Sequence, residues 1–220
     1  MLVHMARTEP LRMGFLLAGG KSSRMGADKA FLDFDGQTLL DRALAVMNAV
    51  CDRVAIVGDP AKFAKCGPAQ NGSAKCESVV ADIFSGCGPL AGIHAALVHS
   101  PAELNLMLAV DMPFVSQELL EFLFAVAAEE DNHAIITVPR TRQGFQPLCA
   151  VYRRDFSTTA EQALRAGKYK IDAAFSAVSI RVIEEAELAA AGSSEQSFFN
   201  VNTPQDRVVA EDGDFDSPPR

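Results

Sequence analysis

The sequence predicts an α/β fold with a mainly parallel central sheet and helices on both of its faces. Short apolar runs alternate along the chain with longer segments of helical periodicity, an order typical of parallel sheets with crossover helices. The expected strands are almost continuously apolar, as strands buried on both faces are. The composition, with 49% hydrophobic and 22% charged residues, provides for a substantial core.

The chain is expected to form one domain. Its 220 residues would suffice for one large domain or two small ones, but no internal repeat is visible. The domain is predicted over residues 13–210. Residues 1–12 and the acidic, proline-bearing tail 211–220 are predicted to be flexible termini.

The first half of the chain begins with a buried strand. Residues 13–19, MGFLLAG, run as a strand into a glycine turn. Thr38 is placed to begin a helix, because Asp41 follows three residues later and apolar residues then recur at helical spacing. Strands are predicted at 53–58 and 79–82, and residues 61–77, between them, show only a weak pattern of helix and loop.

The middle of the chain repeats the alternation of helix and strand. Residues 86–100 are predicted as a glycine turn and a helix with Pro89 at its first position. A strand over 104–113 loses its apolar character abruptly at Asp111, and Ser116 is placed to cap a helix that runs to about Glu130. The remaining elements are predicted as strands at 134–139 and 146–152, a helix at 155–166, an edge strand at 178–183, and a last helix that begins at Thr203-Pro204.

The composition argues against several classes of partner. A net charge of −8 leaves no global positive field to attract nucleic acid or anionic lipid. The sequence contains no run of eighteen apolar residues, so no membrane-spanning helix is predicted. Residues 1–12 lack the apolar stretch of a signal peptide. The five cysteines form no CxxC pair, which favours free thiols in a reducing cytoplasm over a disulfide framework or a zinc knuckle. The histidines His94 and His99 are five residues apart, the wrong spacing for a shared metal.

The segment LLAGGKSSRMGADK, residues 16–29, is a candidate phosphate site. Gly19 and Gly20 allow a sharp bend at which backbone N–H groups approach a ligand, and Lys21, Arg24 and Lys29 add positive charge. The segment matches neither the P-loop pattern nor GxGxxG. The alternative interpretation is a tight turn whose charged side chains are solvated.

Polar residues at the ends of later strands strengthen the first interpretation. Asp111 follows a buried strand, and in an open α/β sheet ligands bind beyond the carboxyl ends of the strands, where a carboxylate beside phosphates is a natural Mg²⁺ ligand. Asp82 also closes a strand, ahead of two glycines, and is a candidate contact for a ribose or base. Asn200 and Asn202 offer paired amides before a helix start. Helix capping by Asp111 and turn formation by the other residues are the alternatives.

These residues together resemble those of a known family. LAGGKSSRMGADK is similar to the LAGGxSxRMGxDK signature of the molybdenum cofactor guanylyltransferases, the MobA-like nucleotidyltransferases. The resemblance continues, in the same order as in the family, through the segments Gly88-Pro89-Leu90-Ala91-Gly92, Asp111-Met112-Pro113, Gln146-Pro147-Leu148 with Tyr152, and Asn200-Val201-Asn202-Thr203-Pro204. It implies a single-domain Rossmann-like nucleotidyltransferase fold, and transfer of GMP from GTP to molybdopterin with Mg²⁺.

The resemblance also implies a role for each matching residue. Arg24, Lys29 and Asp111 would be catalytic, with Arg24 and Lys29 neutralising the triphosphate and Asp111 holding Mg²⁺. The nucleotide would be lined by Leu17, Ala18, Gly19, Gly20, Lys29, Asp82 and Asp111. The pterin side would be formed by Gln146, Pro147, Leu148, Asn200 and Asn202. Gly58-Asp59 departs from the family, where an Asn often follows the second strand, so one nucleoside contact is in doubt.

Several related functions compete with this interpretation. Molybdopterin cytidylyltransferases, which use CTP, usually carry LAAG and GHP motifs where this chain has LAGG and Gln146-Pro147-Leu148. Sugar-phosphate nucleotidyltransferases generally carry LAAGxGTRM and further domains. A catalytically inactive nucleotide-binding partner in cofactor delivery is the alternative outside enzymes. GTP and molybdopterin are the expected substrates, with transient contacts to proteins that supply molybdopterin or mature molybdoenzymes.

Overall fold

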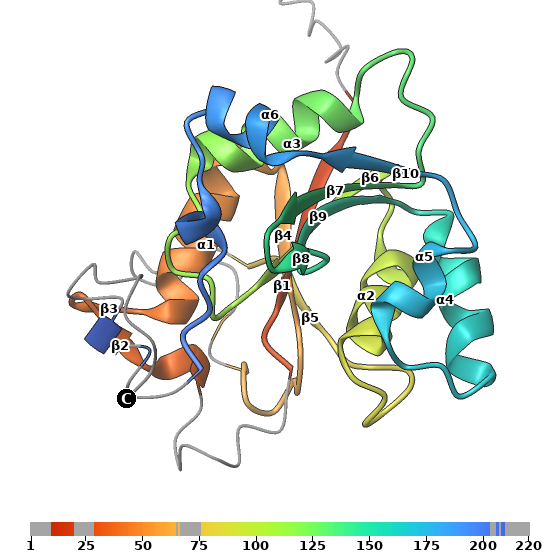
Figure 1. Cartoon of the computed structure of the whole chain (residues 1–220). Coiled ribbons are helices and arrows are strands. Elements are labelled where there is room, and N and C mark those ends of the chain that lie inside the picture. The colour runs from red at the N-terminus through yellow and green to blue at the C-terminus, as the bar shows by residue number, and fades with distance from the viewer. Residues whose placement is uncertain are drawn as a thin grey trace, which may run out of the picture.

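The fold is built on one large mixed sheet. The computed structural model describes residues 10–19, 29–64, 66, 76–202, 206 and 208–209 (Figure 1). The sheet has eight strands, seven of them in the order β10-β7-β9-β6-β1-β4-β5, with β8 paired to β7. These strands are β1 (Arg12–Leu17), β4 (Arg53–Val57), β5 (Ser78–Val80), β6 (Leu104–Ala109), β7 (Ile136–Thr141), β8 (Gly144–Phe145), β9 (Cys149–Arg153) and β10 (Ile180–Ile183).

The predicted parallel sheet is confirmed in its first half. β1 pairs in parallel with both β4 and β6, and β4 with β5. β9 is antiparallel to β6 and to β7, so the sheet is mixed overall, and β10 lies at the edge as predicted. In register, Leu17 lies beside Val57 on one side and Ala109 on the other. The carboxyl ends of three parallel strands therefore lie at one edge of the sheet.

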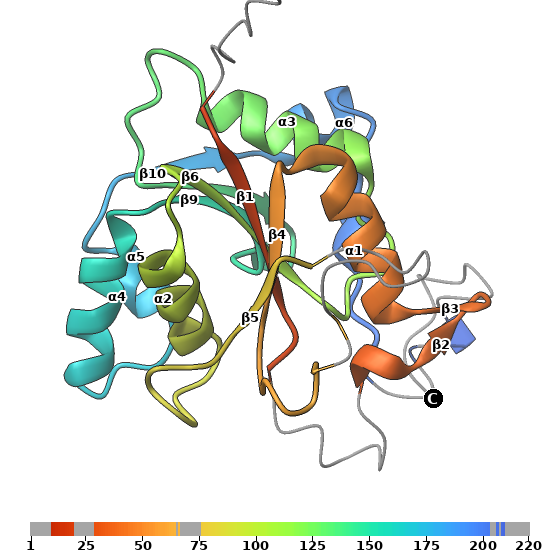
Figure 2. The ribbon, with the colours of Figure 1, turned by 180° about the vertical axis from the view of Figure 1, so that it is seen from behind.

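Helices cover both faces of the sheet, as the sequence predicts (Figures 1 and 2). The helices are α1 (Leu39–Val50), α2 (Pro89–His99), α3 (Gln117–Ala127), α4 (Phe156–Arg165), α5 (Ile171–Phe175) and α6 (Glu185–Ala190). α1, α3 and α6 share one hydrophobic cluster, and α2, α4 and α5 share the other. Alternate residues of β1 join opposite clusters, with Leu16 on the α1 face and Phe15 and Leu17 on the α2 face, as the period of a strand requires.

Side-chain caps fix where two helices begin. The Oγ1 of Thr38 accepts a hydrogen bond from the Asp41 backbone N–H at 3.0 Å, and the Oγ of Ser116 accepts one from the Leu119 N–H at 3.2 Å. Both caps were predicted, and each satisfies an N–H that has no partner within its helix. Pro89 is the first residue of α2, and Gly88 before it has a φ of 73°, a conformation that favours glycine.

The short elements and some boundaries differ from the sequence prediction. The hairpin of β2 (Asp33–Phe34) and β3 (Gln37–Thr38), the 3-10 turns η1 (Lys29–Phe31) and η2 (Glu195–Phe198), and the helices α5 and α6 were not predicted. The helix after Ser116 is shorter than expected and ends at Ala127. β6 ends at Ala109, so Asp111 lies two residues beyond the strand. Thr203 and Pro204, the predicted start of the last helix, lie outside the described residues.

The cysteines are all free thiols. Cys51 and Cys149 are buried, and burial raises the pKa of each thiol to about 12, which keeps it protonated. Within the part of the chain that the structure describes, no helix has the length and apolar character needed to cross a membrane.

Candidate active site

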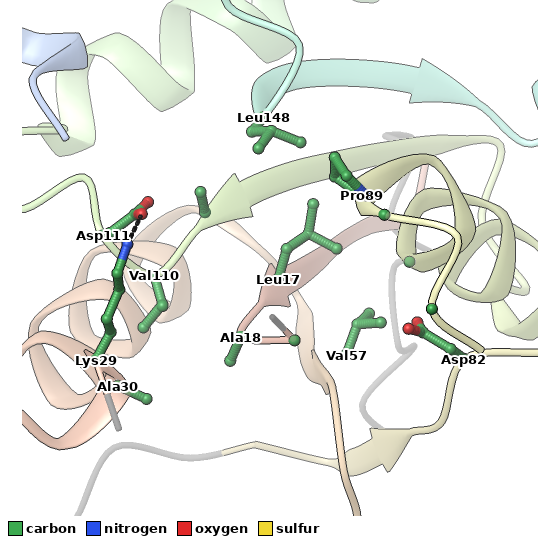
Figure 3. A pocket seen from close by; sticks show the side chains of 15 residues that line it. Leu17, Ala18, Lys29, Ala30, Val57, Asp82, Pro89, Val110, Asp111 and Leu148 are labelled. Carbon is green, nitrogen blue, oxygen red and sulfur yellow. Dashed lines mark hydrogen bonds and ion pairs between the residues drawn. The ribbon is translucent and has the colours of Figure 1, made fainter. Parts of the chain in front are cut away.

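A cavity of about 580 Å³ opens where β1, β4 and β6 end (Figure 3). Its walls come from the ends of these strands, the loop before α2, the first turns of α2, and η1. Of the residues singled out from the sequence, Leu17, Ala18, Gly19, Lys29, Asp82, Asp111 and Leu148 line it. The other lining residues are Ala30, Val57, Gly86, Gly88, Pro89, Gly92, Ala109 and Val110.

Lys29 and Asp111 meet at one end of the cavity (Figure 3). The Nζ of Lys29 lies 3.5 Å from the Oδ2 of Asp111, and their side chains are 24% and 20% exposed. Burial raises the pKa of Asp111, and the nearby Lys29 ammonium acts in the opposite direction. A polyanionic ligand that carries a cation would replace the contact between these two residues. Its negative groups would contact the Lys29 ammonium, and its cation would contact the Asp111 carboxylate.

The segment after η2 passes over this pair. Lys29 also donates a hydrogen bond to the side-chain oxygen of Asn202, and the Val201 N–H donates to the Asp111 carbonyl at 2.9 Å. The Asn202 backbone N–H in turn donates to the Oδ2 of Asp206 at 2.8 Å. Asn202, predicted on the pterin side, is thereby joined directly to the residue predicted to bind the triphosphate.

Asp82 lies on the opposite side of the cavity (Figure 3). Its Oδ1 is buried and has no hydrogen-bond partner among the described residues, and burial raises the pKa of the carboxyl. A Cβ built on Gly92 would lie 3.7 Å from this oxygen and 3.5 Å from the Cδ2 of Leu17, so the glycine keeps the floor beside Asp82 open. Burying a polar atom without a hydrogen-bond partner costs free energy, so Asp82 is a candidate contact for a ligand.

The cavity floor between these two ends is apolar. Leu17, Ala18 and Val57 lie between the Lys29–Asp111 pair and Asp82 (Figure 3). An apolar surface with polar groups at both ends suits a ligand that has a flat ring system at one end and charge at the other.

The segment 146–148 is divided between the cavity and the sheet. Leu148 lines the cavity, whereas the Nε2 of the nearly buried Gln146 donates to the Oγ1 of Thr141 at 3.1 Å. The Pro147 carbonyl accepts from the Tyr152 hydroxyl at 2.8 Å. Gln146 and Pro147 thus have hydrogen bonds that stabilise β7 and β9, and neither is among the cavity-lining residues.

The remaining predicted residues lie apart from the cavity or outside the described residues. The Nδ2 of Asn200 donates to the Phe198 carbonyl at 3.4 Å, a local bond within the loop. Gly20, Lys21 and Arg24 lie outside the described residues. Val57 and Gly92 were missed as lining residues. Val57 could have been found from its position at the end of the strand that pairs with β1, and Gly92 from the glycine turn that begins α2.

The donor set fits one kind of metal ion. Across the described ranges, no group of three or more His, Cys, Asp or Glu side chains is placed to hold a metal. Asp111 instead offers one carboxylate at the Lys29 end of the cavity, and Mg²⁺ commonly binds through one or two carboxylates with the remaining positions filled by phosphate oxygens and water. The residues present therefore fit a hard cation that arrives with a phosphorylated ligand.

Comparison with known proteins decides the family. The model of the MobA-like NTP transferase domain matches residues 14–179. The chain belongs to this family. A probable molybdenum cofactor guanylyltransferase of Pelotomaculum thermopropionicum is 38% identical over 90% of this chain and 90% of its own length. A molybdenum cofactor guanylyltransferase of Desulfosudis oleivorans is 34% identical over 90% of this chain and 93% of its own length.

Solved structures of MobA-like and other nucleotidyltransferases share the fold. The molybdopterin-guanine dinucleotide biosynthesis protein A of Archaeoglobus fulgidus is 27% identical and superimposes with a TM-score of 0.76, covering 93% of this chain and all of its own. A 2-C-methyl-D-erythritol 4-phosphate cytidylyltransferase of Thermus thermophilus, 18% identical, shows the same fold with a TM-score of 0.62 over 91% of this chain and 97% of its own. MobA-like nucleotidyltransferases are enzymes that generally use a divalent metal.

Proposed function

We propose that this enzyme transfers GMP from GTP to molybdopterin, with Mg²⁺ as the divalent ion, and releases pyrophosphate. The observation that carries the proposal is the cavity whose two ends hold the Lys29–Asp111 pair and the unpartnered Asp82. The names of the relatives that match across most of the chain supply the identity of the two substrates.

The two ends of the cavity bind different parts of GTP. The triphosphate lies at Lys29, where the ammonium group replaces its contacts with Asp111 and Asn202 by contacts with phosphate oxygens. Gly19 and Gly20 bring backbone N–H groups to the phosphates, and Arg24 adds a second positive charge. The nucleoside lies over Leu17, Ala18 and Val57, with Asp82 as its polar contact.

The reaction is a displacement at phosphorus. A terminal phosphate oxygen of molybdopterin attacks the α-phosphorus of GTP, a new P–O bond forms, and the bond to the bridging oxygen of the β-phosphate breaks with pyrophosphate as leaving group. Two anions must approach each other, so alignment and charge neutralisation by Lys29 and Arg24 supply most of the catalysis. No general base is needed, because a phosphate monoester is already an anion near neutral pH.

Asp111 is the residue that would hold Mg²⁺. When bound there, the ion neutralises charge on the phosphates and polarises the reacting phosphoryl group. The Asp111 backbone is fixed for this role from two sides, because the carbonyl accepts the Val201 N–H and the residue follows β6 in the centre of the sheet.

Molybdopterin lies on the side of Leu148 and Asn202. Leu148 supplies an apolar wall of the cavity, and Asn202 reaches Lys29 from the segment that crosses over Asp111. Gln146 and Pro147 precede Leu148 and support this wall through their own hydrogen bonds, and Asn200 precedes Asn202 in the segment that crosses over Asp111.

Nucleotide binding tests the proposal and its alternatives. Calorimetry with Mg²⁺ compares GTP, CTP, ATP and UTP on the purified chain. Selective binding of GTP supports the guanylyl transfer. Preference for CTP would retain the fold and the chemistry but make the product a cytosine dinucleotide. Binding of none of the four would leave the segment 16–29 as a turn without a phosphate ligand and would favour an inactive partner in cofactor delivery that has also lost nucleotide binding.

The proposed substrates also suggest the protein partners of the enzyme and its location in the cell. We expect transient contacts with proteins that supply molybdopterin and with those that mature molybdoenzymes. GTP supply and free cysteine thiols favour the cytoplasm as the site of the reaction.

A further inference from the structure

The loop of residues 81–88 forms one wall of the cavity and is held from behind by aromatic contacts. This cavity-wall loop connects β5 to α2, and its residues Asp82, Gly86 and Gly88 line the cavity. Phe84 lies in the middle of the loop, is half-buried, and packs against the hydrophobic cluster of the α2 face. It is not among the cavity-lining residues.

Two side chains from different helices hold the Phe84 ring. The ring of His94, on α2, meets it edge to face, with centroids 5.2 Å apart and planes inclined at 69°. The guanidinium of Arg165, at the end of α4, lies over the ring with its Cζ 5.7 Å from the centroid. We refer to His94 and Arg165 as the Phe84 socket. Each contact adds to the hydrophobic burial of the ring.

The charges around the socket favour a neutral His94. His94 is 3% exposed, and its Nδ1 has no hydrogen-bond partner among the described residues. Burial lowers the pKa of its imidazole, with Glu161 opposing the shift and Arg165 adding to it. The Nε and Nη2 of Arg165 donate to one Glu161 oxygen at 2.9 and 2.6 Å. A neutral imidazole places no second cation beside the guanidinium, so both groups can contact Phe84.

Phe84 is the large side chain of the cavity-wall loop that packs behind the cavity, and the much smaller Cys87 packs against the same hydrophobic cluster. Gly86 and Gly88 have φ values of 74° and 73°, and neither has a side chain that could anchor the loop. The Oδ1 of Asp82 makes no hydrogen bond to any described residue. Phe84 is therefore the large side chain through which the loop is joined to the two helices behind it.

We propose that Phe84, seated in the socket of His94 and Arg165, is a positioning residue that holds Asp82 and the cavity-wall loop in place for the nucleoside. The inference rests on the proposed function, because it places the nucleoside of GTP at Asp82. Phe84 acts from behind the wall and contacts no substrate. A substitution of Phe84 should therefore change the affinity for the nucleotide and leave the rate of phosphoryl transfer at Lys29 and Asp111 unchanged.

Kinetics of two Phe84 variants test the positioning role. Phe84→Leu removes the ring from the socket, and we expect KM for GTP to rise about tenfold with kcat within about twofold of wild type. Phe84→Tyr keeps the ring and should restore the wild-type KM. Phe122→Leu is the matched control, because Phe122 is a half-buried phenylalanine of α3 on the opposite face. It should leave KM for GTP unchanged.

A double-mutant cycle tests whether Phe84 acts through Asp82. In an Asp82→Ala background, Phe84→Leu should have an effect of less than about twofold on the Kd for GTP, because the two changes remove the same contact. Equal effects of Phe84→Leu with and without Asp82 would overturn the inference, as would a fall in kcat with unchanged KM.

A substitution at an exposed position tests the same contact without disturbing the core. Arg165 is 68% exposed, and Arg165→Gln should raise KM for GTP about threefold through loss of the cation over the ring. If wild type binds GTP and neither Phe84→Leu nor Arg165→Gln changes its affinity, the inference is wrong and the proposed function stands. If wild type itself binds no GTP, the proposed function fails, and the inference fails with it.

Discussion

Lys29 and Asp111 are 82 positions apart in the sequence, and the fold brings their charges within 3.5 Å beyond the carboxyl ends of the parallel strands. Lys29 comes from η1 and Asp111 from the loop after β6, so the pair depends on the central strands and on the turn before α1. Asn202 adds a third contact from near the end of the described chain. A ligand that recruits the lysine must compete with both partners.

Asp111→Ala should lower turnover by about a hundredfold or more, because the variant lacks the carboxylate that would hold the divalent ion beside the phosphates. The fold should be retained, since Asp111 lies beyond the end of β6 and outside the core. Initial rates of pyrophosphate release and a thermal melt measure the two properties. Asp131→Ala, at an exposed position after α3, is the control. Near-normal activity in folded Asp111→Ala would refute the metal role.

Lys29→Ala should weaken GTP binding about tenfold or more while leaving binding of guanosine nearly unchanged, because in the proposed complex the ammonium group contacts the phosphates and not the nucleoside. Calorimetry with both ligands separates these effects. Arg142→Ala, which removes a cation that is 83% exposed and distant from the cavity residues, should change neither. Equal GTP affinity in Lys29→Ala and wild type would remove Lys29 from the site.

Asp82→Asn should stabilise the protein at pH 7 while weakening GTP binding. Burial raises the pKa of Asp82 in the folded state, so the folded protein holds this proton more tightly than the unfolded chain does. Stability is therefore lost as pH rises from the ordinary value of 3.8 through the folded pKa, because the ionised carboxylate has one buried oxygen without a hydrogen-bond partner among the described residues. Asparagine removes that charge.

Urea unfolding at pH 7 and pH 4 measures the effect of Asp82→Asn on stability. The stability gain should be smaller at pH 4 than at pH 7, because a lower pH favours the protonated wild-type carboxyl, which lacks the charge that asparagine removes. Asp131→Asn, at an exposed position, should show no comparable gain. An Asp82→Asn variant less stable than wild type at pH 7 would show that the carboxylate is paired in solution.

At the scale of the elements, the long periodic segments were predictable and the short ones were not. The runs that became β1, β4 and β6 are almost continuously apolar, and the caps at Thr38 and Ser116 are local patterns that need no tertiary partner. α5 and β2 span five and two residues, too few for a period to appear, and tertiary contacts decide them. The antiparallel direction of β9 depends on the connection through β7 and β8, which the pattern of one strand does not contain.

The candidate site was predictable to the same extent as the elements that carry it. Asp111 and Asp82 follow recognisable strands, so their place at one edge of the sheet could be inferred. The contact of Asn202 with Lys29 could not, because it depends on how the chain returns over 173 positions. The burial of Gln146 between β7 and β9 was missed because a polar side chain gives no sign that its partner is the hydroxyl of Thr141.

The packing of α1 on β1 leaves little room at Gly14. A Cβ at this position would lie 2.7 Å from the Cε of Met47 and 2.8 Å from the Sγ of Cys51. Gly14→Ala should therefore lower the free energy of unfolding by about 1–3 kcal/mol, because the buried side chains of Met47 and Cys51 must repack to admit the methyl group. Urea unfolding measures the change. Gly19→Ala, whose Cβ would lie 3.8 Å from its nearest neighbours among the described residues, is the matched control, and an equal effect of the two variants would contradict this packing argument.

At the scale of the whole molecule, an acidic protein binds a polyanion through local geometry. The chain carries a net charge of −8, so its overall field repels GTP and molybdopterin alike. In the proposed complex, Lys29 at the cavity and a divalent ion that arrives with the nucleotide compensate for this repulsion. The fold places these groups where three parallel strands end, and the same architecture occurs in nucleotidyltransferases of other specificity.

The most direct test of the whole account is product formation by the purified chain. Molybdopterin is mixed with GTP or CTP in the presence of Mg²⁺, and both pyrophosphate and the pterin dinucleotide are measured. The account predicts pyrophosphate and a guanine dinucleotide in equal amounts from GTP, with little product from CTP. Efficient formation of the cytosine dinucleotide, or no product from either nucleotide, would contradict it.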